Sequence, residues 1–231
     1  GFKWDSEQTH ESIRPNMLEE AYEAVDAINS GDIKHLKEEL GDVLLQVVLH
    51  SQIAADNNEF NFEDVADGIN KKLIHRHPRV KNVDEILSNW DKLKKEEKPH
   101  RKSVLDGISK SQSALMTAQK LSKKAVKVGF EWAKEEDVLI CVKSEIKEFL
   151  EAKTKEEMEL EFGDILFALV NLARWRNLDA EQCLIKANKK FDTRFRKMEE
   201  IARNENLELE KLTLEEWDNL WKKAKKEIVL Q

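Results

Sequence analysis

The chain repeats one pattern of segments, and this duplication constrains the fold more than any other feature. Three pairs of segments correspond in the same order: GFKW at 1–4 with GFEW at 129–132, EEAYEAVDA at 19–27 with SEIKEFLEA at 144–152, and INKKLIHR at 69–76 with ANKKFDTR at 187–194. The spacing differs between the copies only where loops between helices can absorb the difference. The sequence therefore predicts two tandem copies of one domain.

The sequence predicts four helices in each copy, because apolar residues recur at intervals of three and four positions. In the first copy the helices cover 13–30, 33–47, 63–77 and a shorter stretch around Trp90, and in the second copy 137–152, 155–174, 179–204 and 213–227. Gly (7) and Pro (3) are scarce, and 37% of the residues are charged, which favours long helices over sheets with many turns. The predicted fold class is all-α.

Local signals mark several helix ends. Gly31 stands where a C-terminal cap belongs, and Asp32 is suited to the N-cap of the next helix. Thr154 and Thr213 each begin a Thr-x-x-Glu capping box. These four positions predict where one helix stops and another begins.

The helices group into two domains. We expect an N-terminal domain at 1–98, a linker at 99–112 and a C-terminal domain at 113–231. A helical stretch at 113–127 precedes the second GFEW and has no counterpart before the first copy. We therefore expect a further helix upstream of Gly1.

Charge and hydropathy exclude several classes of protein. A formal net charge of -7 argues against general nucleic-acid binding, which needs an excess of Lys and Arg. No apolar run approaches the roughly 18 residues that would span a bilayer, so no membrane contact is expected. Cys141 and Cys183 fall on apolar helical positions, which predicts core packing and no disulfide framework. These features favour a cytoplasmic protein.

Each copy carries four acidic residues on its first two helices. They are Glu20, Glu23, Glu39 and Asp42 in the first copy and Glu145, Glu148, Glu161 and Asp164 in the second. Two acids three positions apart lie on one face of a helix, so antiparallel packing of the two helices would bring four carboxylates together. Such crowding is tolerable with a cation between them, and oxygen-only ligands favour Mg²⁺, with Mn²⁺ as a substitute. The alternative is that these acids belong to solvated helix faces.

A glycine lies between the two acids on the second helix of each copy, at Gly41 and Gly163. A glycine inside a helix costs about 1 kcal/mol relative to alanine, so its presence needs a reason. We expect the partner helix or a metal-bound phosphate to approach the backbone there.

Basic and aromatic residues recur on the third and fourth helices. The second copy has Lys190 and Arg194 four positions apart, then Trp221 and Lys225 at the same spacing. The first copy repeats this set as Lys72, Arg76, Trp90 and Lys94. A carboxylate-held divalent ion commonly serves a phosphate substrate, and these cations would suit its charge. The alternative is ordinary surface pairing of the cations and core packing of the Trp residues.

Several motifs together resemble the MazG family of nucleoside triphosphate pyrophosphohydrolases. They are WDSEQTHESIRP, LEEAYEAVDAI, EELGDVLLQVV, HRHPRV and the paired ExxE and ExxD acids, and the resemblance covers essentially all 231 positions. It implies an all-α fold of two tandem MazG-like repeats of the four-helix-bundle type, completed by dimerisation. Two positions depart from the family pattern: Lys3 precedes Trp4 where relatives usually have Cys-Pro, and Ser144 stands at the position of Glu19.

The resemblance also implies an activity, namely Mg²⁺-dependent hydrolysis of nucleoside triphosphates to the monophosphate and pyrophosphate, with broad specificity. In the second copy the four acids would hold the ion, Lys190 and Arg194 would act as catalytic and substrate-binding cations, and Lys225 and Trp221 would bind the nucleotide. The second copy is favoured as the working site because its upstream helix is present. The sequence singles out no general base. It leaves open a narrower phosphohydrolase for dUTP or dCTP, and a nucleotide- and metal-binding regulatory protein without turnover.

Overall fold

The computed structural model describes residues 7–76 and 102–229, and among these no strand occurs. The chain divides into two compact units, Gly1–Pro99 and His100–Gln231. The described helices of the first unit are α2 (Arg14–Ser30), α3 (Ile33–Asp56) and α4 (Phe62–Arg76). Those of the second are α6 (Ala114–Val126), α7 (Glu135–Glu151), α8 (Lys155–Trp175), α9 (Ala180–Asn204), the short 3-10 helix η1 (Leu209–Lys211) and α10 (Leu214–Val229). The predicted all-α fold class is confirmed.

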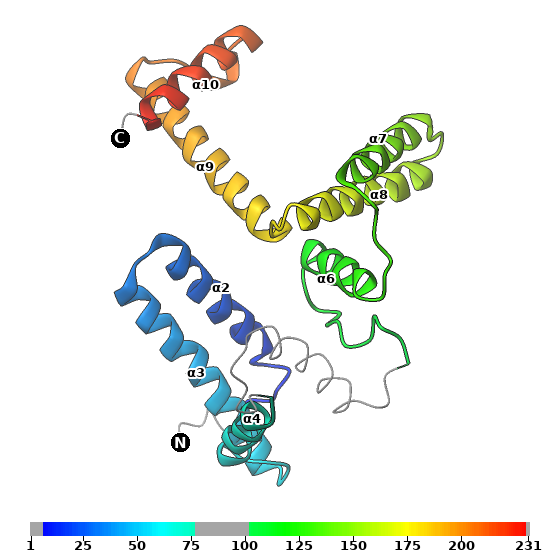
Figure 1. The fold of residues 1–231 in the computed structure, drawn as a ribbon. Coiled ribbons are helices and arrows are strands. Elements are labelled where there is room, and N and C mark those ends of the chain that lie inside the picture. Colours follow the sequence, from blue (N-terminus) through cyan, green and yellow to red (C-terminus); the bar gives the residue numbers. More distant parts are fainter. Residues whose placement is uncertain (1–6, 77–101, 230–231) are drawn as a thin grey trace, which may run out of the picture. The chain divides into compact units, whose positions relative to one another are not determined.

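A helical hairpin of α2 and α3 forms the body of the first unit (Figure 1). Gly31 ends α2 in the left-handed conformation at φ 75°, and its N–H donates to the carbonyl of Ile28. The Asp32 carboxylate begins α3 by accepting hydrogen bonds from the backbone N–H groups of Lys34 and His35. Both predicted caps are confirmed, and they turn the chain back on itself within two residues.

The interior of the α2–α3 hairpin is partly polar. Small apolar side chains such as Ala27 and Ala54 are buried in it, and so are the polar residues Glu39, Gln46 and Ser51. The Ser51 hydroxyl is satisfied within its own helix, where it donates to the carbonyl of Val47. Polar side chains therefore occupy positions in this hairpin that would ordinarily hold apolar ones.

The other helices predicted for the first unit are found in part. The helix predicted at 33–47 continues to Asp56, and the helix predicted at 63–77 is α4, which buries no residue in the described chain. The helix predicted around Trp90 lies outside the described residues.

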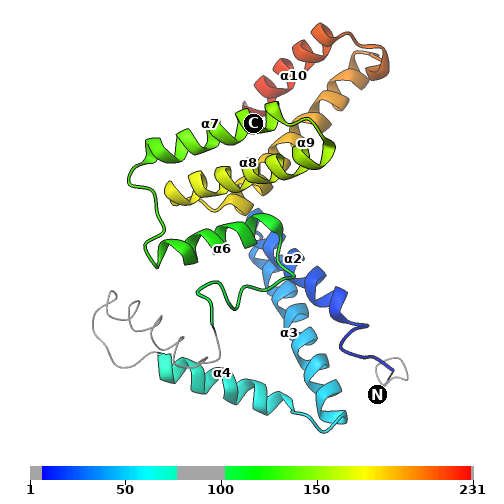
Figure 2. The ribbon, with the colours of Figure 1, turned by 90° about the vertical axis from the view of Figure 1, so that its right-hand side faces the viewer.

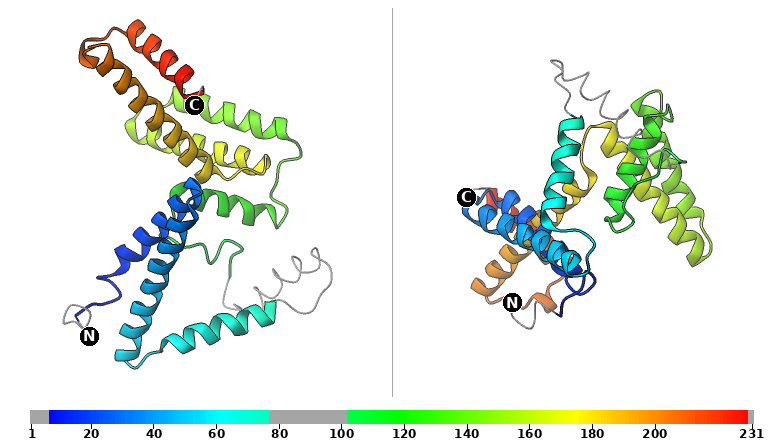
Figure 3. Two further views of the ribbon diagram at one scale, coloured as in Figure 1. Left: turned by 90° about the vertical axis from the view of Figure 1, so that its left-hand side faces the viewer. Right: turned by 90° about the horizontal axis from the view of Figure 1, so that it is seen from below.

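Two further hairpins, α7–α8 and α9–α10, build the second unit (Figures 2 and 3). The predicted capping box is present at the start of α8, where the Thr154 side chain accepts from the Glu157 N–H and the Glu157 carboxylate reaches back. Thr213 and Glu216 make the same reciprocal bonds before α10. Helix α6, which matches the stretch predicted at 113–127, packs against α8 and α9.

One hydrophobic cluster of the second unit lies between α9 and α10. Its buried members are Met198, Ile201, Ala202, Leu220 and Ala224. Partly buried aromatic side chains, including those of Phe195, Trp217 and Trp221, pack against this cluster. Burial of apolar area at about 25 cal/mol per Å² holds the long α9 against α10.

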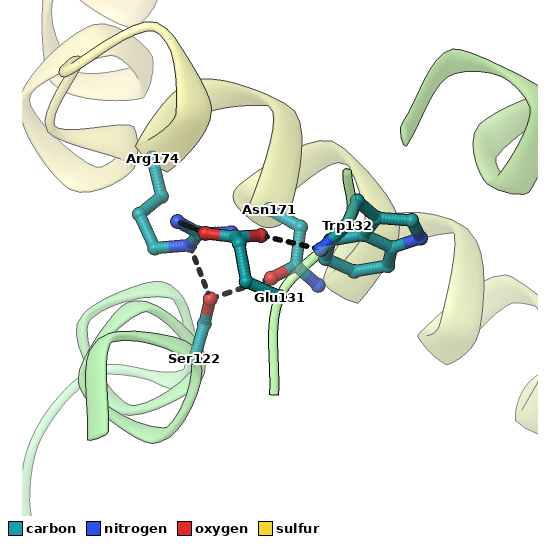
Figure 4. Close-up of polar contacts among 5 residues, drawn as sticks. All are labelled: Ser122, Glu131, Trp132, Asn171 and Arg174. Carbon is teal, nitrogen blue, oxygen red and sulfur yellow. Dashed lines mark hydrogen bonds and ion pairs between the residues drawn. The ribbon is translucent and has the colours of Figure 1, made fainter. Parts of the chain in front are cut away.

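A hydrogen-bond network joins α6, α8 and the segment before α7 (Figure 4). The Arg174 guanidinium donates two bonds to the Glu131 carboxylate, at 2.5 and 2.8 Å, and a third to the Ser122 hydroxyl at 2.6 Å. Ser122 in turn donates to the Asn171 side-chain oxygen at 2.5 Å. The Glu131 carboxylate also accepts from the Trp132 N–H at 3.0 Å. This network ties three segments together at one place.

Three further predictions concern the cysteines, membrane-spanning helices and the division into domains. Cys141 and Cys183 are free thiols, but Cys183 is exposed and Cys141 only half-buried, so the prediction of core packing is wrong for Cys183. No helix of the described chain combines the length and apolar character that crossing a membrane requires. The division of the chain into repeats with a linker at 99–112 stays a prediction.

Candidate metal centres

Three of the four N-terminal acids come together between α2 and α3. Glu20, Glu23 and Glu39 each offer one carboxylate oxygen, and these oxygens lie within 4.8 Å of one another. We call these three residues the N-terminal cluster. The two acids of α2 are three positions apart and so share one face, which the hairpin turns toward Glu39 on α3. Asp42 is not one of the three, although its charge still acts on Glu20.

The N-terminal cluster is short of positive charge. Loss of hydration raises the pKa of Glu20, and repulsion from Asp42, Glu39 and Glu19 raises it further. Loss of hydration also raises the pKa of Glu23, followed by repulsion from Glu39, Glu20 and Glu19 and by a side-chain hydrogen bond with Glu39. In each case loss of hydration and the neighbouring carboxylates make the charged form less favourable than in a solvated glutamate.

Glu39 is the buried member of this cluster, with 6% of its surface exposed. One carboxylate oxygen, Oε1, lies 2.8 Å from Nε2 of His35, one turn earlier on the same helix. The other oxygen, Oε2, is buried and has no hydrogen-bond partner. A buried carboxylate oxygen without a partner is costly, and a divalent cation among three carboxylates would satisfy it. The donor set consists of oxygen atoms alone, so it fits Mg²⁺ or Mn²⁺.

The second unit holds a matching group between α7 and α8. Glu145, Glu148 and Glu161 also offer oxygens within 4.8 Å of one another, and we call them the C-terminal cluster. Loss of hydration raises the pKa of Glu161, and repulsion from Glu148, Asp164, Glu145 and Glu157 adds to it. As with Asp42 in the first unit, Asp164 is not one of the three clustered acids, but its negative charge still acts on Glu161.

Two side chains beside the C-terminal cluster distinguish it from the N-terminal one. The Ser144 hydroxyl donates to Oε1 of Glu148 at 2.9 Å, whereas the corresponding Glu19 adds negative charge to the first cluster. The Cys141 sulfur lies 3.6 Å from Oε1 of Glu145. Burial raises the pKa of the Cys141 thiol, and the nearby carboxylates raise it further, so this thiol stays protonated.

The glycines between the acids have no close neighbour within the described chain. A Cβ atom built at Gly41 or at Gly163 would meet nothing within 4 Å. The expectation that the partner helix of the same chain approaches the backbone there is therefore wrong. The missing side chain instead leaves open space beside the acids, which suits a substrate or a second subunit.

The predicted substrate-binding cations of the second copy form no ion pairs with the acids of the C-terminal cluster in the part of the chain that the structure describes. The guanidinium carbon of Arg194 on α9 lies 5.5 Å from the centre of the Trp221 ring on α10, in a cation–π contact. Among the described residues, no ion pair joins Lys190, Arg194 or Lys225 to the C-terminal cluster. The structure thus brings Arg194 and Trp221 together, and it does not bring the cations to the acids.

The corresponding residues of the first copy are only partly described. Lys72 and Arg76 lie on α4, four positions apart as predicted. Trp90 and Lys94 lie outside the described residues.

Comparison with known proteins decides the family. Residues 8–81 match the model of the MazG nucleotide pyrophosphohydrolase domain. A relative from Thermotoga maritima, named nucleoside triphosphate pyrophosphohydrolase/pyrophosphatase MazG, is 46% identical over 228 residues, which cover 97% of this chain and 89% of its own. The chain belongs to the MazG family.

Other relatives agree with this membership, which confirms the resemblance found in the motifs. The nucleoside triphosphate pyrophosphohydrolase of Escherichia coli K12 is 41% identical over 240 residues, covering 98% of this chain and 91% of its own. The uncharacterized protein YabN of Bacillus subtilis is 45% identical over 236 residues, covering 97% of this chain and 48% of its own. The MazG domain match at 8–81 contains the whole N-terminal cluster.

Proposed function

We propose that this MazG protein hydrolyses nucleoside triphosphates to the monophosphate and pyrophosphate, using a divalent cation, Mg²⁺, held by carboxylates. One observation carries the proposal: in each unit two helices place three carboxylate oxygens within 4.8 Å of one another. The printed names of the Thermotoga and Escherichia relatives support the reaction. Carboxylate sites that leave a metal partly hydrated commonly act on phosphate substrates.

The C-terminal cluster is our preferred working site, with Glu145, Glu148 and Glu161 holding the ion and Asp164 beside them. Bound Mg²⁺ would supply charge neutralisation at the phosphates and a water of lowered pKa. In the reaction the water oxygen forms a bond to the α-phosphorus, and the bond from that phosphorus to the bridging oxygen breaks. The water loses a proton to a base, and pyrophosphate leaves with the bridging oxygen.

Lys190, Arg194 and Lys225 are proposed to bind the phosphates of the substrate, and Trp221 to stack on its base or sugar. The contact between the Arg194 guanidinium and the Trp221 ring supports a shared role for these two side chains. Because this recognition rests on phosphate charge and on an aromatic face that any base can stack on, we propose broad specificity for the base.

The first test is product analysis with purified protein, Mg²⁺ and a panel of ribo- and deoxyribonucleoside triphosphates. We expect pyrophosphate and monophosphate in equal amounts from most of the panel. Chelation of the metal with EDTA should abolish release, and added Mg²⁺ or Mn²⁺ should restore it. Turnover of dUTP or dCTP alone would indicate the narrower enzyme. Release of inorganic phosphate, or nucleotide binding without turnover, would contradict the proposed reaction.

We further infer that the protein is a homodimer. Large apolar side chains on the hairpin helices are exposed, including Leu40 and Leu44 of α3 at 54% each and Phe162 of α8 at 50%. Large apolar side chains exposed one helical turn apart, as Leu40 and Leu44 are, are typical of a surface that a partner covers, and two-fold dimers are the commonest assemblies.

Sedimentation equilibrium should therefore give a mass of twice 26.9 kDa. Leu44→Lys combined with Leu166→Lys places charge on exposed positions of α3 and α8, and we expect it to shift the protein toward the monomer. The exposed Lys155→Glu on α8 is a control for surface charge. A parent protein that sediments as a monomer at micromolar concentration would exclude the dimer.

A further inference from the structure

Gln46 is a buried polar residue that the reaction described above does not use. Only 4% of its surface is exposed. It lies on α3 four positions after Asp42 and seven after Glu39, so it continues the face of the helix that carries the acids. Its side-chain amide favours the charged form of the neighbouring Glu20 carboxylate and so opposes the rise of the Glu20 pKa. Gln46 is thus a buried neighbour of the N-terminal cluster on the same face of α3.

The oxygen of this amide has no partner. Oε1 of Gln46 and Oε2 of Glu39 are both buried without a hydrogen bond. A buried amide oxygen in this state destabilises the fold, because its hydration is lost and not replaced. Two unpartnered acceptors, one on Glu39 of the cluster and one on the neighbouring Gln46, indicate a missing donor or cation at that place.

The C-terminal copy lacks this feature. The spacing that relates Glu39 to Glu161 relates Gln46 to Ala168, which is buried with 4% of its surface exposed. One copy therefore buries a methyl group where the other buries an amide. A purely structural role would be served as well by the apolar residue, so the amide needs another reason.

We propose that Gln46 is a positioning residue of the N-terminal cluster: its N–H group holds the Glu20 carboxylate in place, and its Oε1 accepts a hydrogen bond from a water of a bound divalent cation. The N-terminal cluster then binds the ion without nucleotide, with Gln46 as the outer-shell partner that the C-terminal cluster does not have. This inference rests on the proposed use of a divalent ion. It does not depend on which cluster carries out hydrolysis.

The test measures Mn²⁺ binding by electron paramagnetic resonance in the full chain without nucleotide. The parent carries Glu148→Gln and Glu161→Gln, which silence the C-terminal cluster, and we expect it to bind one ion. Gln46→Met keeps the size of the side chain and removes its amide, and it should weaken Mn²⁺ binding about tenfold. Gln46→Ala should do the same.

The matched control is Gln52→Met, on the same helix. Gln52 is exposed, and its amide donates to Asp56 rather than to the cluster. Mn²⁺ binding should be unchanged in this variant.

The melting temperature without metal separates positioning from packing. Gln46→Met removes an unpartnered buried oxygen, so its apo melting temperature should equal or exceed that of the parent while its Mn²⁺ affinity falls. A lower melting temperature together with lower affinity would indicate a structural role and overturn the proposal. Parent-like Mn²⁺ affinity in both Gln46 variants, or no Mn²⁺ binding by the parent, would also overturn it. Failure of the wild-type protein to release pyrophosphate is a separate result, which bears on the proposed function alone.

Discussion

Replacing Glu148 by glutamine is expected to slow pyrophosphate release about a hundredfold or more. Glutamine keeps the size of the side chain and can still accept the hydrogen bond that Ser144 donates at 2.9 Å. What it removes is the negative charge beside Glu145 and Glu161, on which binding of a divalent ion depends. The measurement is the initial rate of pyrophosphate release at saturating nucleotide and Mg²⁺, with circular dichroism to show that the variant is folded.

Glu23→Gln is the matched comparison, because Glu23 holds the same position in the first copy. We expect a much smaller loss of rate than in Glu148→Gln. The reverse order would place the chemistry in the N-terminal cluster, the one that lies inside the family match at 8–81. Equal losses would mean that both clusters contribute. Full activity in both variants would contradict the proposal that these carboxylates hold the metal.

Helix ends were predictable because they depend on neighbours within a few positions. Gly31 adopts the left-handed conformation and Asp32 accepts from two N–H groups, as their residue types suggest. The Thr154 capping box follows the same local rule. That acidic side chains of two helices lie close together could also be predicted from the sequence. Two acids three positions apart share one face of a helix, and a short turn is enough to bring that face against the next helix.

Other features of the site needed the structure. Gln46 sits on α3 among apolar residues, and its sequence gives no sign of whether its amide is buried or solvated. The sequence does show that Gln46 lies seven positions after Glu39 and so on the same helix face as the acids, which is the one signal that could have linked it to the cluster. Gly41 and Gly163 were predicted to face a partner helix or a metal-bound phosphate. No described part of the chain lies within 4 Å of a Cβ atom built at either position, because the distance between two helices depends on all their contacts.

Long-range pairs were beyond prediction for a different reason. Arg174 and Glu131 are 43 positions apart, and their pairing depends on how α8 packs against the segment before α7. The cations of α9 are a similar case, since helical spacing places Lys190 and Arg194 on one face without saying which part of the molecule that face meets. A 25-residue helix such as α9 spans roughly 37 Å, so the part of the helix that carries these cations decides which neighbours they can reach.

The largest loss of stability is expected from Arg174→Met. The Arg174 side chain is 9% exposed and makes three hydrogen bonds, two to Glu131 and one to Ser122. Removing it should lower the free energy of unfolding by about 2–3 kcal/mol, because bonds to charged groups are lost and the Glu131 carboxylate is left without its cation. The neighbouring Arg176→Met is the control, since Arg176 pairs with Glu135 at an exposed position and should cost at most about 1 kcal/mol. Urea unfolding of both variants measures the difference.

The pH dependence of this difference tests its cause. The Arg174 hydrogen bond lowers the pKa of Glu131 below its ordinary value of 4.5, against the opposing loss of hydration. For a carboxyl group with a lowered pKa, the stabilisation is fully present above the ordinary pKa and is lost as the pH falls through the folded value. The gap in unfolding free energy between the parent and Arg174→Met should therefore be constant from about pH 6 to 8 and narrow below about pH 4.5. A gap that stays the same down to pH 3 would mean that Arg174 stabilises the unit by packing its aliphatic stem and not by its charge.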